Sequence, residues 1–183
     1  MRLPVDLKKA YRLLNHGPTV LVSSAHGEQR NVMAAAWSMP LDFDPPKVTV
    51  VIDKSTLTRE LVDASGEFVL NIPARRLAAE TVAVGSHSGR DGDKFAELNL
   101  ATFPAEKVAA PLLDGCVGWL ECKVIPEPHN QQTYDLYIAE VVAAWADPAD
   151  FSEGHWHFAE GRDRSIHYVA GGTFFETGNE FKV

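Results

Sequence analysis

The fold of the chain is decided by residues 44–73, which read DPPKVTVVIDKSTLTRELVDASGEFVLNIP. After the break at Asp44-Pro45-Pro46, residues 47–52 form an almost continuous apolar run, which predicts a buried strand. Residues 56–64 have helical character and are followed by Gly66, a typical helix end. Residues 67–72 predict a second strand, which Pro73 ends. Two strands are thus joined by one short helix.

The rest of the chain adds more strands than helices. Asp6 can cap a short helix whose apolar positions are Leu7, Ala10, Tyr11 and Leu14. Because the pattern lacks a regular strand–helix alternation, it predicts a mainly β barrel with short helices and disfavours a doubly wound sheet. The other expected elements are strands at 19–25, 31–37, 118–125, 133–145 and 165–169, a helix at 75–84, a polar loop at 85–93, and loss of order at 171–172.

Composition limits the class of protein. The 183 residues suit one domain spanning 1–183, and a net charge of −8 disfavours nucleic acid as the partner. The start lacks the apolar segment of a signal peptide, and the apolar residues 31–41 are too few to span a bilayer. Cys116 and Cys122 are expected in one strand about 20 Å apart, beyond disulfide reach. We therefore expect a cytoplasmic protein with reduced thiols and no membrane contact.

A run of small residues at 31–38 is the first candidate site. Small side chains let backbone N–H groups approach a planar ligand, and Asn31 and Ser38 add side-chain hydrogen bonds. Trp37 offers a flat aromatic surface. A tightly packed buried strand explains the same residues, and composition alone favours that reading.

Two further segments offer polar groups for an anionic ligand. Residues 53–59 place hydroxyls and two cations where a strand ends and a helix begins, which suits a phosphate or a simple helix cap equally well. Residues 86–95 form a Gly- and Ser-containing loop with Lys94 near its end, and a solvated surface loop is the alternative. His155 and His157 lack a third ligand at suitable spacing, so we predict no metal site.

Taken in order, these segments resemble the flavin-reductase-like FMN-binding family, including its flavoredoxin-type members. The segments that carry the resemblance are 17–18, 31–38, 44–52, Ser55 and Thr58, 67–73, 88–89, 93–95, 111–113, 120–122 and 137–142. The resemblance implies a six-stranded Greek-key split barrel that forms a homodimer, with FMN near the subunit interface. It also implies cofactor contacts at Asn31, Met33, Ala34, Ala35, Ala36, Trp37, Ser38, Lys54, Ser55, Thr56, Thr58, Ser88, Gly89, Lys94, His129 and Phe174.

The resemblance leaves two functions open. One is an oxidoreductase that passes electrons from NAD(P)H through FMN to free flavin or another acceptor, with the chemistry on the flavin and no catalytic side chain required. The other is an electron carrier with tightly bound FMN and a redox partner protein. Flavin-reducing members often carry Gly-Asp-His before the Glu-Val-Val strand, whereas Thr133-Tyr134-Asp135 stands there in this chain. A nicotinamide-contacting histidine therefore has no counterpart. The aromatic run at 168–175 is expected to pack on a second copy, and closure of their own barrel by Phe174 and Phe175 is the alternative.

Overall fold

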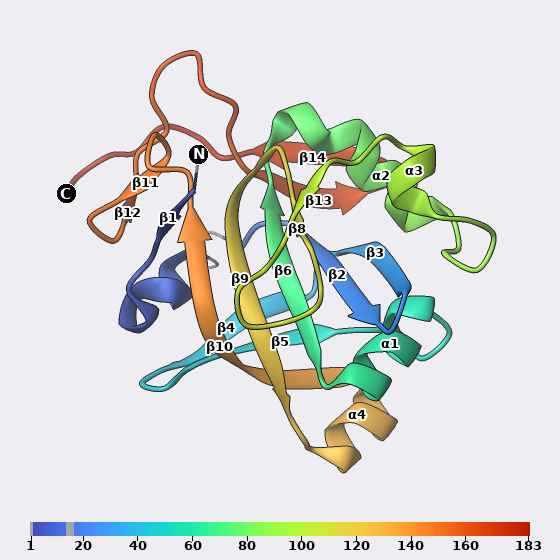
Figure 1. Cartoon of the computed structure of the whole chain (residues 1–183). Coiled ribbons are helices and arrows are strands. Elements are labelled where there is room, and N and C mark those ends of the chain that lie inside the picture. The colour runs from blue at the N-terminus through green and yellow to red at the C-terminus, as the bar shows by residue number, and fades with distance from the viewer. Residues whose placement is uncertain (1, 14–16) are drawn as a thin grey trace.

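One curved antiparallel sheet forms the body of the protein in a computed structural model that describes residues 2–13 and 17–183. The path of the sheet is β3-β2-β6-β9-β10-β5-β4, and the short β1 (Leu3–Pro4) pairs with β10. Consecutive strands β3 and β4 thus lie at opposite ends of the path, and the sheet curls into a split barrel (Figure 1). The long strands are β2 (Val20–His26), β3 (Gln29–Ala35), β4 (Ser38–Phe43), β5 (Pro46–Val51), β6 (Glu67–Pro73), β9 (Cys116–Ile125) and β10 (Leu136–Ala146).

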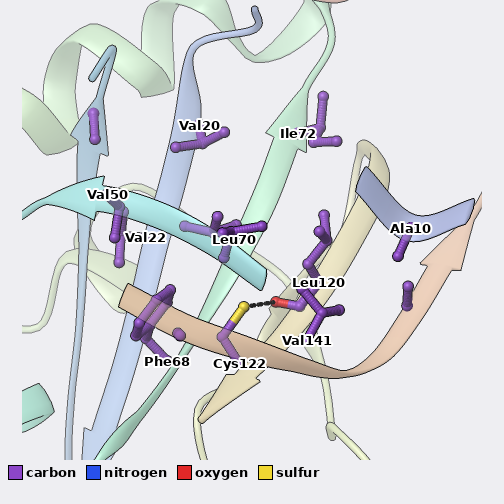
Figure 2. Packing of buried hydrophobic residues seen from close by; sticks show 14 of the residues in the cluster. Ala10, Val20, Val22, Val50, Phe68, Leu70, Ile72, Leu120, Cys122 and Val141 are labelled. Carbon is purple, nitrogen blue, oxygen red and sulfur yellow. Dashed lines mark hydrogen bonds between the residues drawn. The ribbon is translucent and has the colours of Figure 1, made fainter. Parts of the chain in front are cut away.

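Two apolar cores stabilise the sheet, one on each face. The larger fills the barrel, where Val20, Val22, Phe68, Leu70 and Leu120 pack together (Figure 2). The second includes Leu21 and Val69, the neighbours of the first set along the strands, because successive strand residues point to opposite faces. Residues 104–111 cover this second core, and Val108 and Ala110 are among the side chains packed there.

The helices lie around the barrel, and α1 begins and ends at recognisable signals. In α1 (Leu57–Ser65), the Thr56 side chain accepts a hydrogen bond from the Arg59 N–H, and Gly66 ends the helix in the left-handed region. Figure 1 shows α1 and α4 at the lower end of the barrel and α2 at the upper end. The remaining helical elements are η1 (Leu7–Leu13), η2 (Arg75–Leu77), α2 (Ala78–Ser86), α3 (Lys94–Glu97) and α4 (Pro128–Tyr134).

Four expectations require correction. The N-terminal helix is a 3-10 helix; Leu14 lies outside the described residues. Residues 38–43 form β4, which the proline-rich neighbourhood concealed. Residues 128–134 form α4, so the expected strand from 133 begins later, because Pro128 favours a helix start and Asp135 ends the helix in the left-handed region. Gly171 and Gly172 turn the chain between two further strands, β13 (Ile166–Ala170) and β14 (Thr173–Glu176).

The shorter strands form small hairpins outside the main sheet. These are β7 (Thr102–Phe103) with β8 (Leu112–Leu113), and β11 (Phe151–Ser152) with β12 (His155–Trp156). Cys116 and Cys122 both lie in β9, buried and free, as the sequence predicts, and burial raises the pKa of each thiol. Within the described residues, no helix is both long and apolar enough to cross a membrane.

Candidate functional site

A cleft beside β3 brings the three candidate segments together. It consists of a narrow cavity of about 230 Å³ and a wider one of about 550 Å³. Ala34 and Gly85 line both cavities, so the two adjoin there and together form the cleft. A Cβ on Gly85 would lie 3.5 Å from the Cβ of Ala34, so small residues let α2 approach β3 closely at this junction.

The start of α1 forms one wall of the narrow cavity. Ser55, Thr56 and Leu57 line it from this side. The first N–H groups of a helix lack partners within the helix and carry a partial positive charge, which favours an anion. The Asp53 carboxylate opposes an anion from outside the lining, and its pKa is lowered chiefly by the hydrogen bond from the Ser55 hydroxyl. It is fully exposed, so water screens its charge.

The loop after α2 forms the opposite wall and lies tightly on β3. Ser88, Gly89 and Arg90 line the cavity from the loop, and Asn31 lines it from β3. A Cβ on Gly89 would lie 2.6 Å from Asn31 Cγ, closer still to its Oδ1, and 3.0 Å from Leu57 Cδ2. Asn31 is fixed in turn, because its amide donates to Thr58 Oγ1 at 2.9 Å. Only a glycine at 89 permits this close packing.

Lys94 lines the narrow cavity and connects two of the elements that form it, β3 and α2. Its ammonium group is buried and donates to Val32 O on β3 (2.9 Å) and to Val84 O on α2 (2.7 Å). Burial lowers the pKa of this lysine. The side chain lines the cavity, so its charge acts there although two of its hydrogen bonds are structural.

The wider cavity is lined mainly by small and apolar residues. Ala35 lines it from the end of β3 and Ala36 from the next position along the chain, and Thr81 and Val82 line it from α2. The C-terminal hairpin supplies Tyr168, Gly171, Gly172 and Phe174, and the Tyr168 and Phe174 rings meet edge to face with centroids 5.3 Å apart. The hairpin lies beside α2 at the upper end of the barrel (Figure 1).

The structure brings most of the predicted site residues together, but not all. Met33 lines the narrow cavity with those already named. Five predicted residues line neither cavity: Trp37, Ser38, Lys54, Thr58 and His129. Thr58 is buried behind Asn31, and the Ser38 hydroxyl is a buried group without a hydrogen-bond partner. Trp37 is 76% exposed, and His129 lies exposed on α4 against Tyr134.

Sequence reasoning missed several lining residues. Gly85 and His87 come from the end of α2, which was expected to finish before them. The sequence predicts Arg90 in a polar loop and Tyr168 in a strand, but it does not single out either residue as lining a cavity. Loop residues are the usual carriers of binding, so the Gly-, Ser- and Arg-containing loop was the available signal.

Comparison with known proteins agrees with this arrangement. The flavin reductase like domain model matches residues 12–167. An FMN-binding domain of a flavin reductases-like enzyme from Shewanella baltica is 50% identical, with a TM-score of 0.97 over 100% of this chain and 97% of that chain. The uncharacterized protein YddH of Escherichia coli is 44% identical over 179 residues, 96% of this chain and 95% of that protein.

Flavoredoxin of Desulfovibrio vulgaris shares the fold at 24% identity, with a TM-score of 0.79 over 91% of this chain and 90% of that chain. The split barrel, the cleft beside β3 and the match over most of the sequence lead to the same assignment. The chain belongs to the flavin reductase-like domain family.

Proposed function

We propose that the protein binds FMN in the cleft beside β3 as a single flavin reductase-like domain. It would act as a cytoplasmic oxidoreductase that passes electrons from NAD(P)H to free flavin or another acceptor. The observation that carries this proposal is the adjoining pair of cavities, a smaller one lined by polar residues at a helix start and a larger one lined mainly by small and apolar residues. Their order suits a phosphate and a ring system linked by a polyol chain, and the FMN-binding relative from Shewanella baltica is similar along the whole chain.

The residues present fit FMN. The phosphate would lie at the start of α1, within reach of Ser55, Thr56, Ser88 and Arg90. The ring would lie in the wider cavity between the alanines of β3 and the aromatic pair Tyr168 and Phe174. The alternative for residues 31–38, a tightly packed buried strand, also describes Asn31 and Val32, because both side chains are buried.

Bound FMN would supply the hydride- and electron-accepting chemistry. The chain's own part is to bind, orient and shield the ring. Tyr168 and Phe174 would exclude water from one side of it, and Lys94 would hold the strand and helix that form its other boundary. Hydride transfer to the ring would require no side chain that acts as an acid or a base.

The test uses the purified protein as isolated. Mass spectrometry of the released cofactor should identify FMN, and anaerobic NADH or NADPH should bleach its absorbance near 450 nm, roughly the flavin maximum, by hydride transfer. Release of FAD alone, or a protein that neither carries nor binds FMN, would refute the cofactor assignment. The reductase part fails if bound FMN stays oxidised with both nucleotides.

One observation favours an electron carrier as the alternative. Thr133-Tyr134-Asp135, where flavin-reducing relatives often carry a histidine, closes α4 instead: Asp135 caps its end and accepts from Arg59 at 3.0 Å. Asp135 therefore serves the fold. A carrier of this kind would hold FMN tightly, resist both nicotinamide nucleotides, and take electrons from a reduced partner protein.

We also propose a homodimer, because an apolar stripe follows the outer face of the edge strand β4. Met39, Leu41 and Phe43 alternate along β4 with exposed fractions of 53%, 47% and 64%, and the exposed Trp37 precedes them. Such a stripe on an unpaired edge favours burial against a twin. Trp37, which lines neither cavity of the cleft, would then be free to approach a partner's site.

Replacing Leu41 by lysine is expected to convert a dimer of about twice 20.1 kDa into a monomer, because the charge would lose its water in the interface. Light scattering measures the mass. Tyr134→Lys is the control, since Tyr134 is another large hydrophobic side chain, 60% exposed on α4 rather than on β4, and its replacement should leave the mass unchanged. A monomeric parent protein, or a Leu41→Lys variant that stays dimeric, would contradict this interface.

A further inference from the structure

The loop that covers the narrow cavity is tied to α1 by one side chain, Arg90. Its Nη1 donates to Ser55 O at 2.8 Å, and its Nη2 forms an ion pair with Glu60 Oε1 at 2.5 Å. Ser55 belongs to the wall at the start of α1, and Arg90 to the loop wall. The guanidinium group therefore bridges the two walls.

The bridge lies at the end of the cleft away from the wider cavity. Ser55 and Arg90 line only the narrow cavity, whereas the junction with the wider one lies at Ala34 and Gly85. A ligand that enters from the wider cavity thus reaches the bridge last. The narrow cavity has a volume of about 230 Å³, which suits a polyol chain and one phosphate but leaves no room for a further nucleotide.

We propose that the Arg90–Glu60 bridge is the determinant that selects a flavin mononucleotide over a flavin dinucleotide. This inference rests on the proposed function, namely that the cleft holds a flavin with its phosphate at the start of α1. In a dinucleotide, a second phosphate and an adenosine continue from the first phosphate, and they would have to leave the cavity through the bridge. A monophosphate ends before it and gains the positive charge of Arg90.

The expected size of the selection follows from the exposure of the pair. The Arg90 and Glu60 side chains are 44% and 58% exposed, so water screens their attraction, and the bridge opens at a modest cost. We expect it to contribute about a threefold preference for FMN over FAD, which corresponds to about 0.7 kcal/mol.

Glu60→Gln tests the bridge separately from the positive charge of Arg90, because it removes the ion pair and keeps the guanidinium group. Glu60 does not line the cavity, so this variant should keep its FMN affinity while the ratio of the FAD to the FMN dissociation constant falls about threefold. Arg90→Gln opens the bridge and also removes the cation, so FMN affinity and the ratio should both fall. Fluorescence titration of the apoprotein with FMN and with FAD measures both constants.

Arg30→Gln is the matched control. Arg30 forms the other ion pair beside this loop, to Asp93 at 3.1 Å with similar exposure, and lines neither cavity. Its removal should leave the ratio unchanged. An unchanged ratio in Glu60→Gln, even with weaker FMN binding in Arg90→Gln, would overturn the selection role and leave Arg90 as a phosphate ligand only. A parent protein that binds no flavin would refute the proposed function itself.

Discussion

Replacing Gly89 by alanine is expected to weaken FMN binding by about 10- to 100-fold. The added methyl group would meet Asn31 at the Cγ and Oδ1 atoms and Leu57 at 3.0 Å. Asn31 cannot move aside freely, because it is buried and bonded to Thr58. Overpacking at a closely packed contact costs about 1–3 kcal/mol, and each 1.4 kcal/mol is tenfold in affinity. The loop would have to lift from β3, which opens the narrow cavity.

Gly92→Ala provides the control within the same loop. A Cβ there would meet mainly the carboxylate of Glu97, with Cδ at 2.9 Å, and that flexible end can swing away. Neither Gly89 nor Gly92 has a positive φ, so the comparison isolates steric contact from backbone strain. Equal FMN dissociation constants for the two variants, measured by fluorescence titration, would contradict a tight contact at Gly89.

Removing the carboxylate of Glu121 is expected to produce the largest loss of stability. Glu121 is fully buried in β9 and accepts hydrogen bonds from three donors: Glu106 N at 3.1 Å, Lys107 N at 2.6 Å and Trp145 Nε1 at 2.8 Å. In Glu121→Ala all three lose their partner, and a buried unpaired donor costs about 1–3 kcal/mol. We expect a total loss of about 3–5 kcal/mol, and a melting temperature about 10 °C lower.

Urea unfolding of the apoprotein measures this loss without interference from the cofactor. Glu67→Ala is the matched control, because Glu67 accepts one hydrogen bond from Ala109 N in the same covering segment, 104–111, at the surface. That variant should lose less than about 1 kcal/mol. If Glu121→Ala costs no more than Glu67→Ala, the buried carboxylate does not anchor the segment.

The sequence determined most of the barrel strands, because their signals are local. Apolar runs such as residues 47–52 and 67–72 became β5 and β6, and the turn residues between them gave a capped α1 ending at Gly66. The two cysteines in one strand, β9, also follow from spacing alone. The family resemblance is confirmed, and the FMN contacts inferred from it remain predictions.

Only the tertiary structure decided which polar residues gather in the cleft and which serve the fold. Lys94 reads as a ligand-binding cation, yet its hydrogen bonds join β3 to α2; Thr58 reads as a phosphate ligand, yet it is buried behind Asn31. Gly85 and Tyr168 both line the wider cavity although they lie far apart in the sequence. Local patterns specify strands and caps, whereas contacts between distant segments depend on how the sheet curls, and that geometry has no local signal in the sequence.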